Sequence, residues 1–402
     1  MKEILQRILG TIAAIAGIAL LILIVGLVIF KGTEPKKEKD TQEFTRVTTE
    51  AVATATDSVA EEIESEEWIT ATTEAPVATM TNPTRPSSGL SDYNFPELTA
   101  ADDKEDPIFL IYSKNVSIGV GSTFDVHDHV GYADDVDREL DLKVNGTVDT
   151  SKEGDYNLTL TLTDDAGHST VKDMTVSVVA GSGQEPGPSE VKPSESFSDF
   201  AEKYGGDNVE LGLDVSRWQN DIDFNKVKAA GCDYVIIRIG GYDDDEHYVD
   251  KKYIENIKNA KAAGLKVGIY WHAEESTVEE TVASTEYLLK TLGGEKLDFP
   301  IAYDWEDFQN FENYGMNMHD INNNFEVFCN ELEKAGYEAC LYSSKNFLEN
   351  TWTNENNHEV WLAHYTDETN YTGDYYMWQH CNDGKIDGIS TAADFNVYYK
   401  DR

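Results

Sequence analysis

The sequence predicts an α/β chain of several parts: a (β/α) barrel of the TIM type at the C-terminus, preceded by a small all-β sandwich, a disordered stalk and one transmembrane helix. Three observations predict this fold class. Strand-like and helix-like runs alternate over residues 208–402. Short runs of alternating polarity fill residues 105–180. An apolar stretch without any charged residue covers residues 8–30.

The apolar stretch 8–30 is long enough to cross a bilayer core of about 30 Å as a helix. No small-x-small cleavage site follows Phe30, so the stretch is expected to stay on the chain as a signal-anchor, with residues 1–7 in the cytoplasm. Basic residues are more frequent after the stretch than before it. The positive-inside rule alone therefore does not place the C-terminal part outside the cell.

Two segments are expected to connect folded parts. Residues 31–104 are rich in Thr, Glu, Ala, Ser and Pro, and their few large apolar residues show no steady period. Such a segment cannot bury enough apolar surface to fold, which predicts a disordered stalk. Residues 181–207 begin with Gly-Ser-Gly and Pro-Gly-Pro sequences and are interpreted as a second linker.

Charge and cysteine content exclude some classes of partner. The formal net charge of -43 argues against nucleic acid and against direct docking on an anionic membrane surface. The absence of any CxxC pair among Cys232, Cys329, Cys340 and Cys381 argues against zinc. Disulfides and free buried thiols both fit these four positions. No metal, no cofactor and no obligate protein partner is predicted, and the run 243–246 is interpreted as a solvated loop rather than a calcium site.

The β-sandwich is predicted from short alternating runs at 116–120, 156–162 and 174–178. Asp164-Asp165-Ala166-Gly167 marks a turn between the last two runs. Strands this short and this closely spaced favour a small sandwich over residues 105–180. Its stretch 153–168 resembles the immunoglobulin-like modules of bacterial surface proteins, for which a spacer role is the default expectation.

The C-terminal part is expected to be one barrel over residues 208–402. Apolar strand-like runs are expected at 209–215, 234–239, 267–271, 298–303, 338–343, 360–363 and 376–379. Amphipathic helical runs are expected at 223–230, 251–263, 278–292 and 322–335. About eight such units in roughly 200 residues predict a compact parallel barrel, whose active site lies at the carboxyl ends of the strands.

Acidic residues follow several of these strands. Asp304 and Glu306 end the run 298–303, and because alternate side chains of a strand share a face, both are expected to point the same way. Two adjacent carboxylates on a buried strand raise each other's pKa, so that one can stay protonated near neutral pH. Asp214 ends the first strand and Asp394 lies near the last. We expect the four carboxylates to converge on one rim, as glycosidic-bond cleavage requires.

Aromatic residues at or near the strand ends are candidates for stacking on sugar rings, with ordinary core packing as the alternative. These residues are Trp218, Tyr270, Trp271, Trp305, Tyr342, Trp361, Tyr365 and Trp378.

Three motifs in this order resemble glycoside hydrolase family 25, the Chalaropsis-type lysozymes or N-acetylmuramidases. They are Gly212-Leu213-Asp214-Val215-Ser216-Arg217-Trp218-Gln219, then Pro300-Ile301-Ala302-Tyr303-Asp304-Trp305-Glu306, then the run 377–396 with Ala393-Asp394-Phe395-Asn396. The resemblance covers roughly residues 208–400. The ending Tyr270-Trp271-His272-Ala273 departs slightly from the usual family strand, which puts the substrate-side wall in doubt.

The resemblance implies cleavage of the β-1,4 bond between N-acetylmuramic acid and N-acetylglucosamine in peptidoglycan. It implies Glu306 as the general acid, Asp304 as its carboxylate neighbour, and Asp214 and Asp394 as the rest of an acidic cleft. Direct attack by Asp304 and assistance by the substrate's acetamido group both stay open. The alternative is a non-catalytic protein that binds glycan on a degenerate barrel. Peptidoglycan strands are the expected partner, and the expected location is the cell membrane, with the catalytic domain on the cell-wall side.

Overall fold

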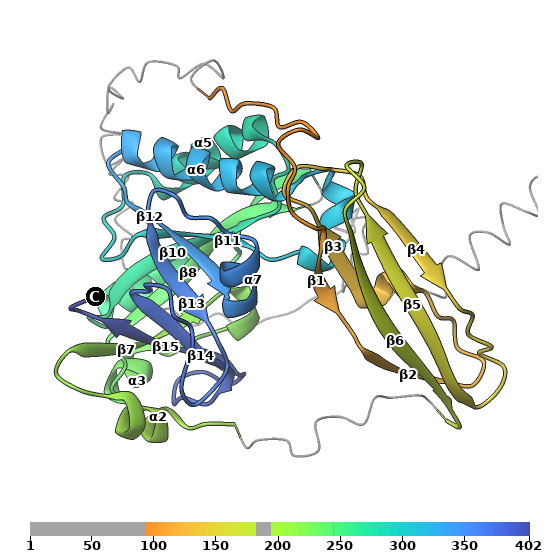
Figure 1. Ribbon diagram of the computed structural model, residues 1–402. Coiled ribbons are helices and arrows are strands. Elements are labelled where there is room, and N and C mark those ends of the chain that lie inside the picture. Colours follow the sequence, from red (N-terminus) through yellow and green to blue (C-terminus); the bar gives the residue numbers. More distant parts are fainter. Residues whose placement is uncertain (1–92, 182–193, 244) are drawn as a thin grey trace, which may run out of the picture. The chain divides into compact units, whose positions relative to one another are not determined.

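The computed structural model describes residues 93–181, 194–243 and 245–402 (Figure 1). Residues 93–181 form an all-β part, and residues from 194 onward form a barrel with flanking helices. Within these described residues, no helix has the length and apolar character needed to cross a membrane. The helix predicted over residues 8–30 and nearly all of the predicted stalk lie outside them.

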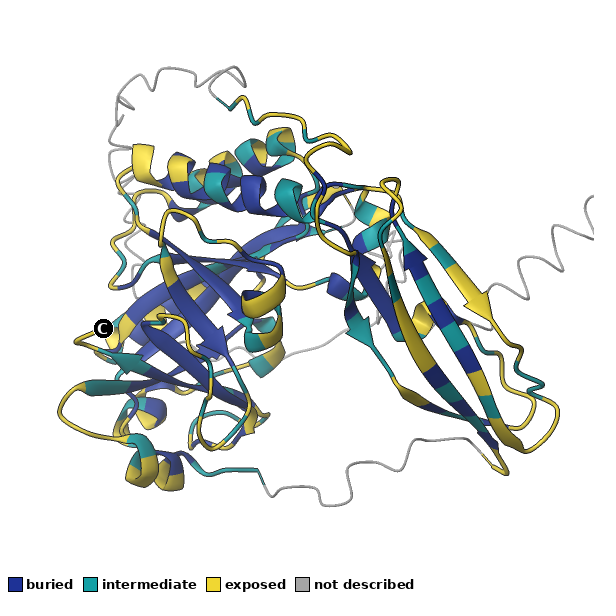
Figure 2. Cartoon of the chain, in the orientation of Figure 1, coloured by how far each residue is buried: buried dark blue, intermediate teal, exposed yellow. Residues whose placement is uncertain are grey.

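The all-β part contains two sheets. Strand β1 (Ile108–Tyr112) pairs antiparallel with β3 (Val130–Ala133), which follows the short helix η2 (Val126–His129). The second sheet has the strand order β2-β6-β5-β4. Its strands are β2 (Asn115–Gly119), β6 (Ser169–Val179), β5 (Gly154–Thr163) and β4 (Asp141–Asn145). Buried and partly exposed residues alternate along β5 and β6, so each presents one face to the core (Figure 2).

The larger sheet closes into a barrel. Its order is β10-β11-β12-β13-β14-β15-β7-β8-β9, and an additional pairing between β10 and β8 completes the ring. The ring strands are β7 (Val209–Val215), β8 (Tyr234–Asp243), β10 (Lys266–Ala273), β11 (Ile301–Trp305), β12 (Ala339–Ser344), β13 (Glu359–Ala363), β14 (Met377–Gly384) and β15 (Ala393–Tyr399). Strand β9 (Glu246–Val249) stands outside the ring as an antiparallel partner of β8.

The prediction of a TIM barrel is wrong. Helices α3 (Phe224–Ala229), α4 (Tyr253–Ala262), α5 (Val278–Leu292), α6 (Met318–Lys334) and α7 (Lys345–Asn350) follow the first strands. Beyond α7, the described chain forms only strands and loops, and β15 runs antiparallel to both of its neighbours, β14 and β7. The segment 385–392 is shorter than the dozen or so residues that a parallel crossover needs, so β15 has to return antiparallel.

Local signals explain why several elements agree with their predicted ranges. Helix α5 begins after a capping box formed by Thr277 and Glu280 and ends at Gly293, which has a left-handed conformation (φ 62°). The helix therefore covers residues 278–292, as predicted. Strand β7 likewise has its predicted bounds.

One helix lies in a segment that the sequence assigned to a linker. Helix α2 (Phe197–Tyr204) is capped by the Ser196 side chain, which accepts a hydrogen bond from the Asp199 amide. Phe197 and Phe200 are buried and pack against Phe395 of β15. Part of the predicted linker 181–207 thus covers the barrel.

All four cysteines are buried free thiols in the structure.

Candidate active site

One cavity of about 410 Å³ gathers acidic and aromatic side chains from the barrel. Strands β7, β10, β11, β12, β13, β14 and β15, or the residues directly after them, supply its lining. The lining residues are Asp214, Tyr270, Asp304, Glu306, Tyr342, Trp361, Tyr365, Gln379, Asn382 and Asp394. All four carboxylates expected from the sequence therefore meet at one place.

Asp304 and Glu306 form one carboxylate pair, at the end of β11. Both line the cavity, while Trp305 between them packs into the layer outside the barrel, as the alternation of a strand requires. Asp304 is buried, whereas Glu306 opens to solvent on its cavity side. Burial and the Glu306 charge raise the pKa of Asp304 well above its usual range. Desolvation and the Asp214 charge raise the pKa of Glu306, and a hydrogen bond shared with Asp304 opposes that rise.

Asp214 and Asp394 form a second pair, because they are direct partners in the antiparallel register of β7 and β15. The amides of Gln379 and Asn396 donate to Oδ2 of Asp214 at 2.9 and 2.7 Å. Burial raises the pKa of Asp214, and these bonds limit the rise by stabilising its anion. Burial, the Asp214 charge and a shared hydrogen bond raise the pKa of Asp394 to about 10. The pair thus holds one proton at neutral pH, on Asp394.

Four aromatic residues stand around the carboxylates: Tyr270, Tyr342, Trp361 and Tyr365. The hydroxyls of Tyr342 and Tyr365 donate to Oε1 of Gln379 at 2.8 and 2.9 Å. The Trp361 indole donates to Oδ1 of Asn396 at 2.8 Å, and its ring packs on Tyr342. Fixed hydrogen bonds therefore orient three of the four rings before any ligand arrives.

Other aromatic candidates lie elsewhere. Trp305 is fully buried against Phe308 and Phe311. Trp271 is also fully buried, and its indole donates to Glu275. The two side chains are part of the same buried core.

Trp378 and Trp218 also differ from the cavity group. The Trp378 indole donates to the His364 carbonyl and packs on Tyr204 and His380. Trp218 lies on the short helix η3 (Arg217–Gln219) just after β7, is 61% exposed, and stacks under the Arg217 guanidinium. Of the predicted set, Tyr270, Tyr342, Trp361 and Tyr365 line the cavity, and Trp218 stands free on the surface.

Sequence reasoning assigned no role to the amides that organise the site. Gln379 and Asn396 lie inside the quoted motifs, and each stands on a strand adjacent to a predicted acid. A search for polar residues at buried strand positions would have found them.

Arg238 on β8 was also missed. It is buried, forms an ion pair with Asp250 at 2.8 Å, and its charge opposes the rise in the pKa of Asp304.

Comparison with known proteins gives a family match for each of the two folded parts. Residues 213–389 match Glycosyl hydrolases family 25, and residues 110–178 match the bacterial surface protein Ig-like domain. The autolytic lysozyme of Clostridium acetobutylicum is 28% identical over 189 residues, which cover 46% of this chain and 55% of that protein. Lysozyme M1 of Streptomyces globisporus is 25% identical over 202 residues, covering 46% of this chain and 67% of that protein.

Among solved structures, a family 25 glycosyl hydrolase from Bacillus anthracis aligns with a TM-score of 0.42 and 22% identity, covering 47% of this chain and 88% of that one. The chain spans about half the length of the clostridial relative. The barrel part of the chain is thus similar to glycosyl hydrolase family 25, and a part similar to the bacterial surface Ig-like domain precedes it.

Proposed function

We propose that the chain is a peptidoglycan hydrolase of the lysozyme type, which cleaves the β-1,4 bond between N-acetylmuramic acid and N-acetylglucosamine. The observation that carries the proposal is the meeting of Asp214, Asp304, Glu306 and Asp394 in one cavity with aromatic walls. The match of residues 213–389 to a glycosidase family and the similarity to two lysozymes support it.

Glu306 acts as the general acid in this proposal. Two carboxyl groups that share a hydrogen bond in a desolvated site cannot both ionise easily, so the pair Asp304–Glu306 retains one proton near neutral pH. Glu306 is the member that opens to solvent, so in this proposal it receives the shared proton through its hydrogen bond with Asp304 and passes it to the glycosidic oxygen. Protonation of that oxygen allows the sugar–oxygen bond to break.

Two of the remaining acids, Asp304 and Asp214, stabilise the positive charge that develops on the sugar ring. Asp304 lies directly beside Glu306, and the Asp214 anion is fixed by two amide donors. Preorganised negative charge in a desolvated site lowers the energy of an oxocarbenium-like transition state. Tyr270 and Trp361 offer flat apolar faces against which a sugar ring stacks. Trp218 offers another such face, exposed after β7.

The substrate sets the place of action. Peptidoglycan lies outside the cytoplasm, so we propose that the barrel works on the cell-wall side of the membrane. Detection of the barrel on intact cells by an antibody would support this location, and detection only after cell lysis would contradict it.

The bond that is cut can be identified from the fragments. Purified cell walls are digested with the protein, the released fragments are reduced with borohydride, and their masses are measured. Reduced muramic acid at the new ends is the expected result. Reduced glucosamine ends would exclude a muramidase. Walls that bind the protein but release no fragment would favour the alternative, a glycan-binding protein without activity.

A further inference from the structure

A second group of carboxylates lies in the Ig-like module, and none of its members lines the acidic cavity. It consists of Asp103, which precedes β1, and Asp134 and Asp135, which follow β3. One carboxylate oxygen from each residue lies within 4.8 Å of the other two. Asp103 and Asp134 are only 3% and 1% exposed, and Asp135 is half-buried. Three acids have therefore been brought together away from water.

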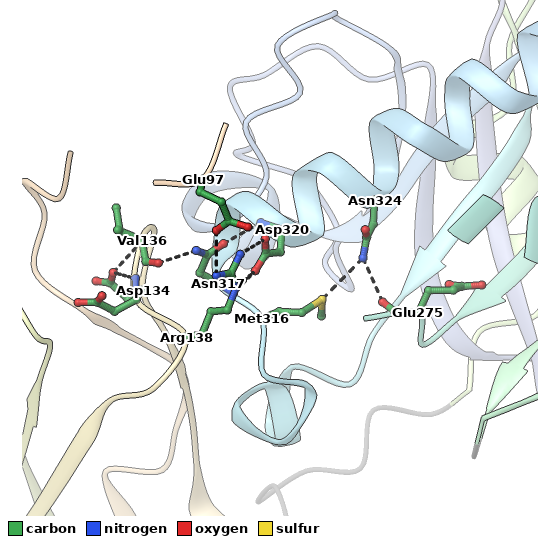
Figure 3. Close-up of polar contacts among 10 residues, drawn as sticks. Glu97, Asp134, Val136, Arg138, Glu275, Met316, Asn317, Asp320 and Asn324 are labelled. Atoms are coloured by element: carbon green, nitrogen blue, oxygen red, sulfur yellow. Dashed lines mark hydrogen bonds and ion pairs between the residues drawn. The ribbon is translucent and has the colours of Figure 1, made fainter. Parts of the chain in front are cut away.

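Several oxygens of this group lack a hydrogen-bond donor. They are both oxygens of Asp103, Oδ2 of Asp134 and Oδ1 of Asp135. The other oxygen of Asp134, Oδ1, accepts the amides of Val136 and Asp137 at 2.8 and 2.7 Å, which fixes that carboxylate in the loop after β3 (Figure 3). A buried carboxylate oxygen without a donor is costly, so these atoms require another partner.

Neighbouring cations do not supply that partner. His168 places Nδ1 3.3 Å from Asp103 Oδ1, but it also lies 3.2 Å from Asp164 Oδ2 and so serves two acids. Lys104 donates its ammonium protons to the backbone carbonyls of Ala101 and Asp103 instead of to a carboxylate. In the described part of the chain, no lysine or arginine forms an ion pair with Asp103, Asp134 or Asp135. The negative charge of the group is thus left largely uncompensated.

We propose that Asp103, Asp134 and Asp135 bind one calcium ion. Their free atoms are all carboxylate oxygens, which are the ligands that calcium prefers. Zinc prefers nitrogen and sulfur ligands, and among the described residues the nitrogen found beside the group belongs to His168, which is already shared between two acids. The half-buried Asp135 gives the ion a way in, and water or backbone carbonyls complete its coordination.

The site would stiffen a loop that contacts the barrel. The Asp134 carbonyl accepts the Met318 amide at 2.8 Å, at the start of α6. The Arg138 guanidinium donates to both oxygens of Asp320 at 2.6 and 2.9 Å (Figure 3). An ion on Asp134 and Asp135 holds the first residues of this loop. Calcium therefore stabilises the contacts that the loop makes with α6.

Calorimetric titration of the chelator-treated full chain with calcium chloride tests the proposal. We expect one ion per chain, with a dissociation constant of about 10⁻⁴ to 10⁻³ M, as in modules that work at millimolar calcium. A calcium concentration of roughly 5 to 10 times the dissociation constant should raise the melting temperature of the chain by several degrees. Asp103→Asn keeps the side-chain shape and should abolish both effects. Asp141→Asn on the exposed edge strand β4 is the matched control and should bind as the parent chain does.

Asp135→Asn is the second variant, because its position is half-buried and should tolerate the change if Asp103→Asn fails to fold. It should weaken calcium binding at least tenfold. Absence of any heat or melting shift in the parent chain at 10 mM calcium would overturn the proposal. Unchanged binding in Asp103→Asn or Asp135→Asn would overturn it too, since the ion would then lie elsewhere. Tight binding of zinc without binding of calcium would assign the group to Asp103, Asp164 and His168 instead.

Discussion

Replacement of Glu306 by glutamine tests the proposed acid directly. Glutamine keeps the size of the side chain and can still form a hydrogen bond with Asp304, so the fold and the cavity should be retained. Only the transferable proton is lost. A positioned general acid contributes about 10²- to 10⁴-fold, which corresponds to roughly 3 to 5 kcal/mol of transition-state stabilisation. Because Asp304 is only 5% exposed and cannot readily take over the task, the loss should lie in the upper half of that range.

The assay is the initial rate of turbidity loss of purified cell walls, measured at equal protein concentration. Glu349→Gln is the control, because it makes the same substitution on the exposed side of α7, outside the cavity. We expect the control to stay within about twofold of the parent, since an exposed ion pair contributes at most about 1 kcal/mol to stability. A Glu306→Gln variant that clears walls at more than a tenth of the parent rate would refute the role assigned to Glu306.

Three further predictions concern stability. Because the pKa of Asp394 rises to about 10 on folding, the folded chain holds this proton more tightly than the unfolded chain, so this group makes stability fall as pH rises from about 4. The amide of an Asp394→Asn variant can still donate to Asp214, so this variant should have lower activity than the parent chain. Its free energy of unfolding at pH 7.5, measured in urea, should nevertheless be higher by about 1 to 2 kcal/mol. An unfolding free energy no higher than that of the parent chain would contradict this account. Gly131→Ala drives a Cβ into the Phe308 carbonyl and should cost about 1 to 3 kcal/mol, whereas Gly206→Ala, whose Cβ meets only Val209 Cγ2 at 4.0 Å, should cost less than about 1 kcal/mol. Since all four cysteines are free, a reductant should leave the melting temperature unchanged, and a drop would reveal a disulfide.

The sequence predicted the individual elements of the barrel better than its architecture. Helix α5 and strand β7 have strong local signals, a capping box in one case and a buried apolar run in the other. The direction of β15 depends instead on the length of the segment before it and on pairing with β7, nearly 180 residues away. Pairing over such a distance leaves no local trace, so the pattern of repeated units suggested a regular barrel that the chain does not form.

The acids of the site and several of the aromatic residues beside them were predictable, and the amides that fix Asp214 were not. Asp214 and Asp304 each end a clear apolar strand, and this position at a strand end carries the information. Trp305 and Trp378 also stand in the quoted motifs, but which face of a strand meets the core depends on tertiary packing. The amides of Gln379 and Asn396 were missed for the same reason, since their partner belongs to another strand.

The antiparallel return of β15 also affects when the barrel can become active. This strand is the last of the ring to be synthesised, and it carries both Asp394 and the amide that fixes the Asp214 anion. A nascent chain that has reached only β14 thus has an open ring and an incomplete set of acids. The ribosome must release β15 before all four acids can meet in one cavity, so the site that the proposed activity needs is among the last features of the barrel to form.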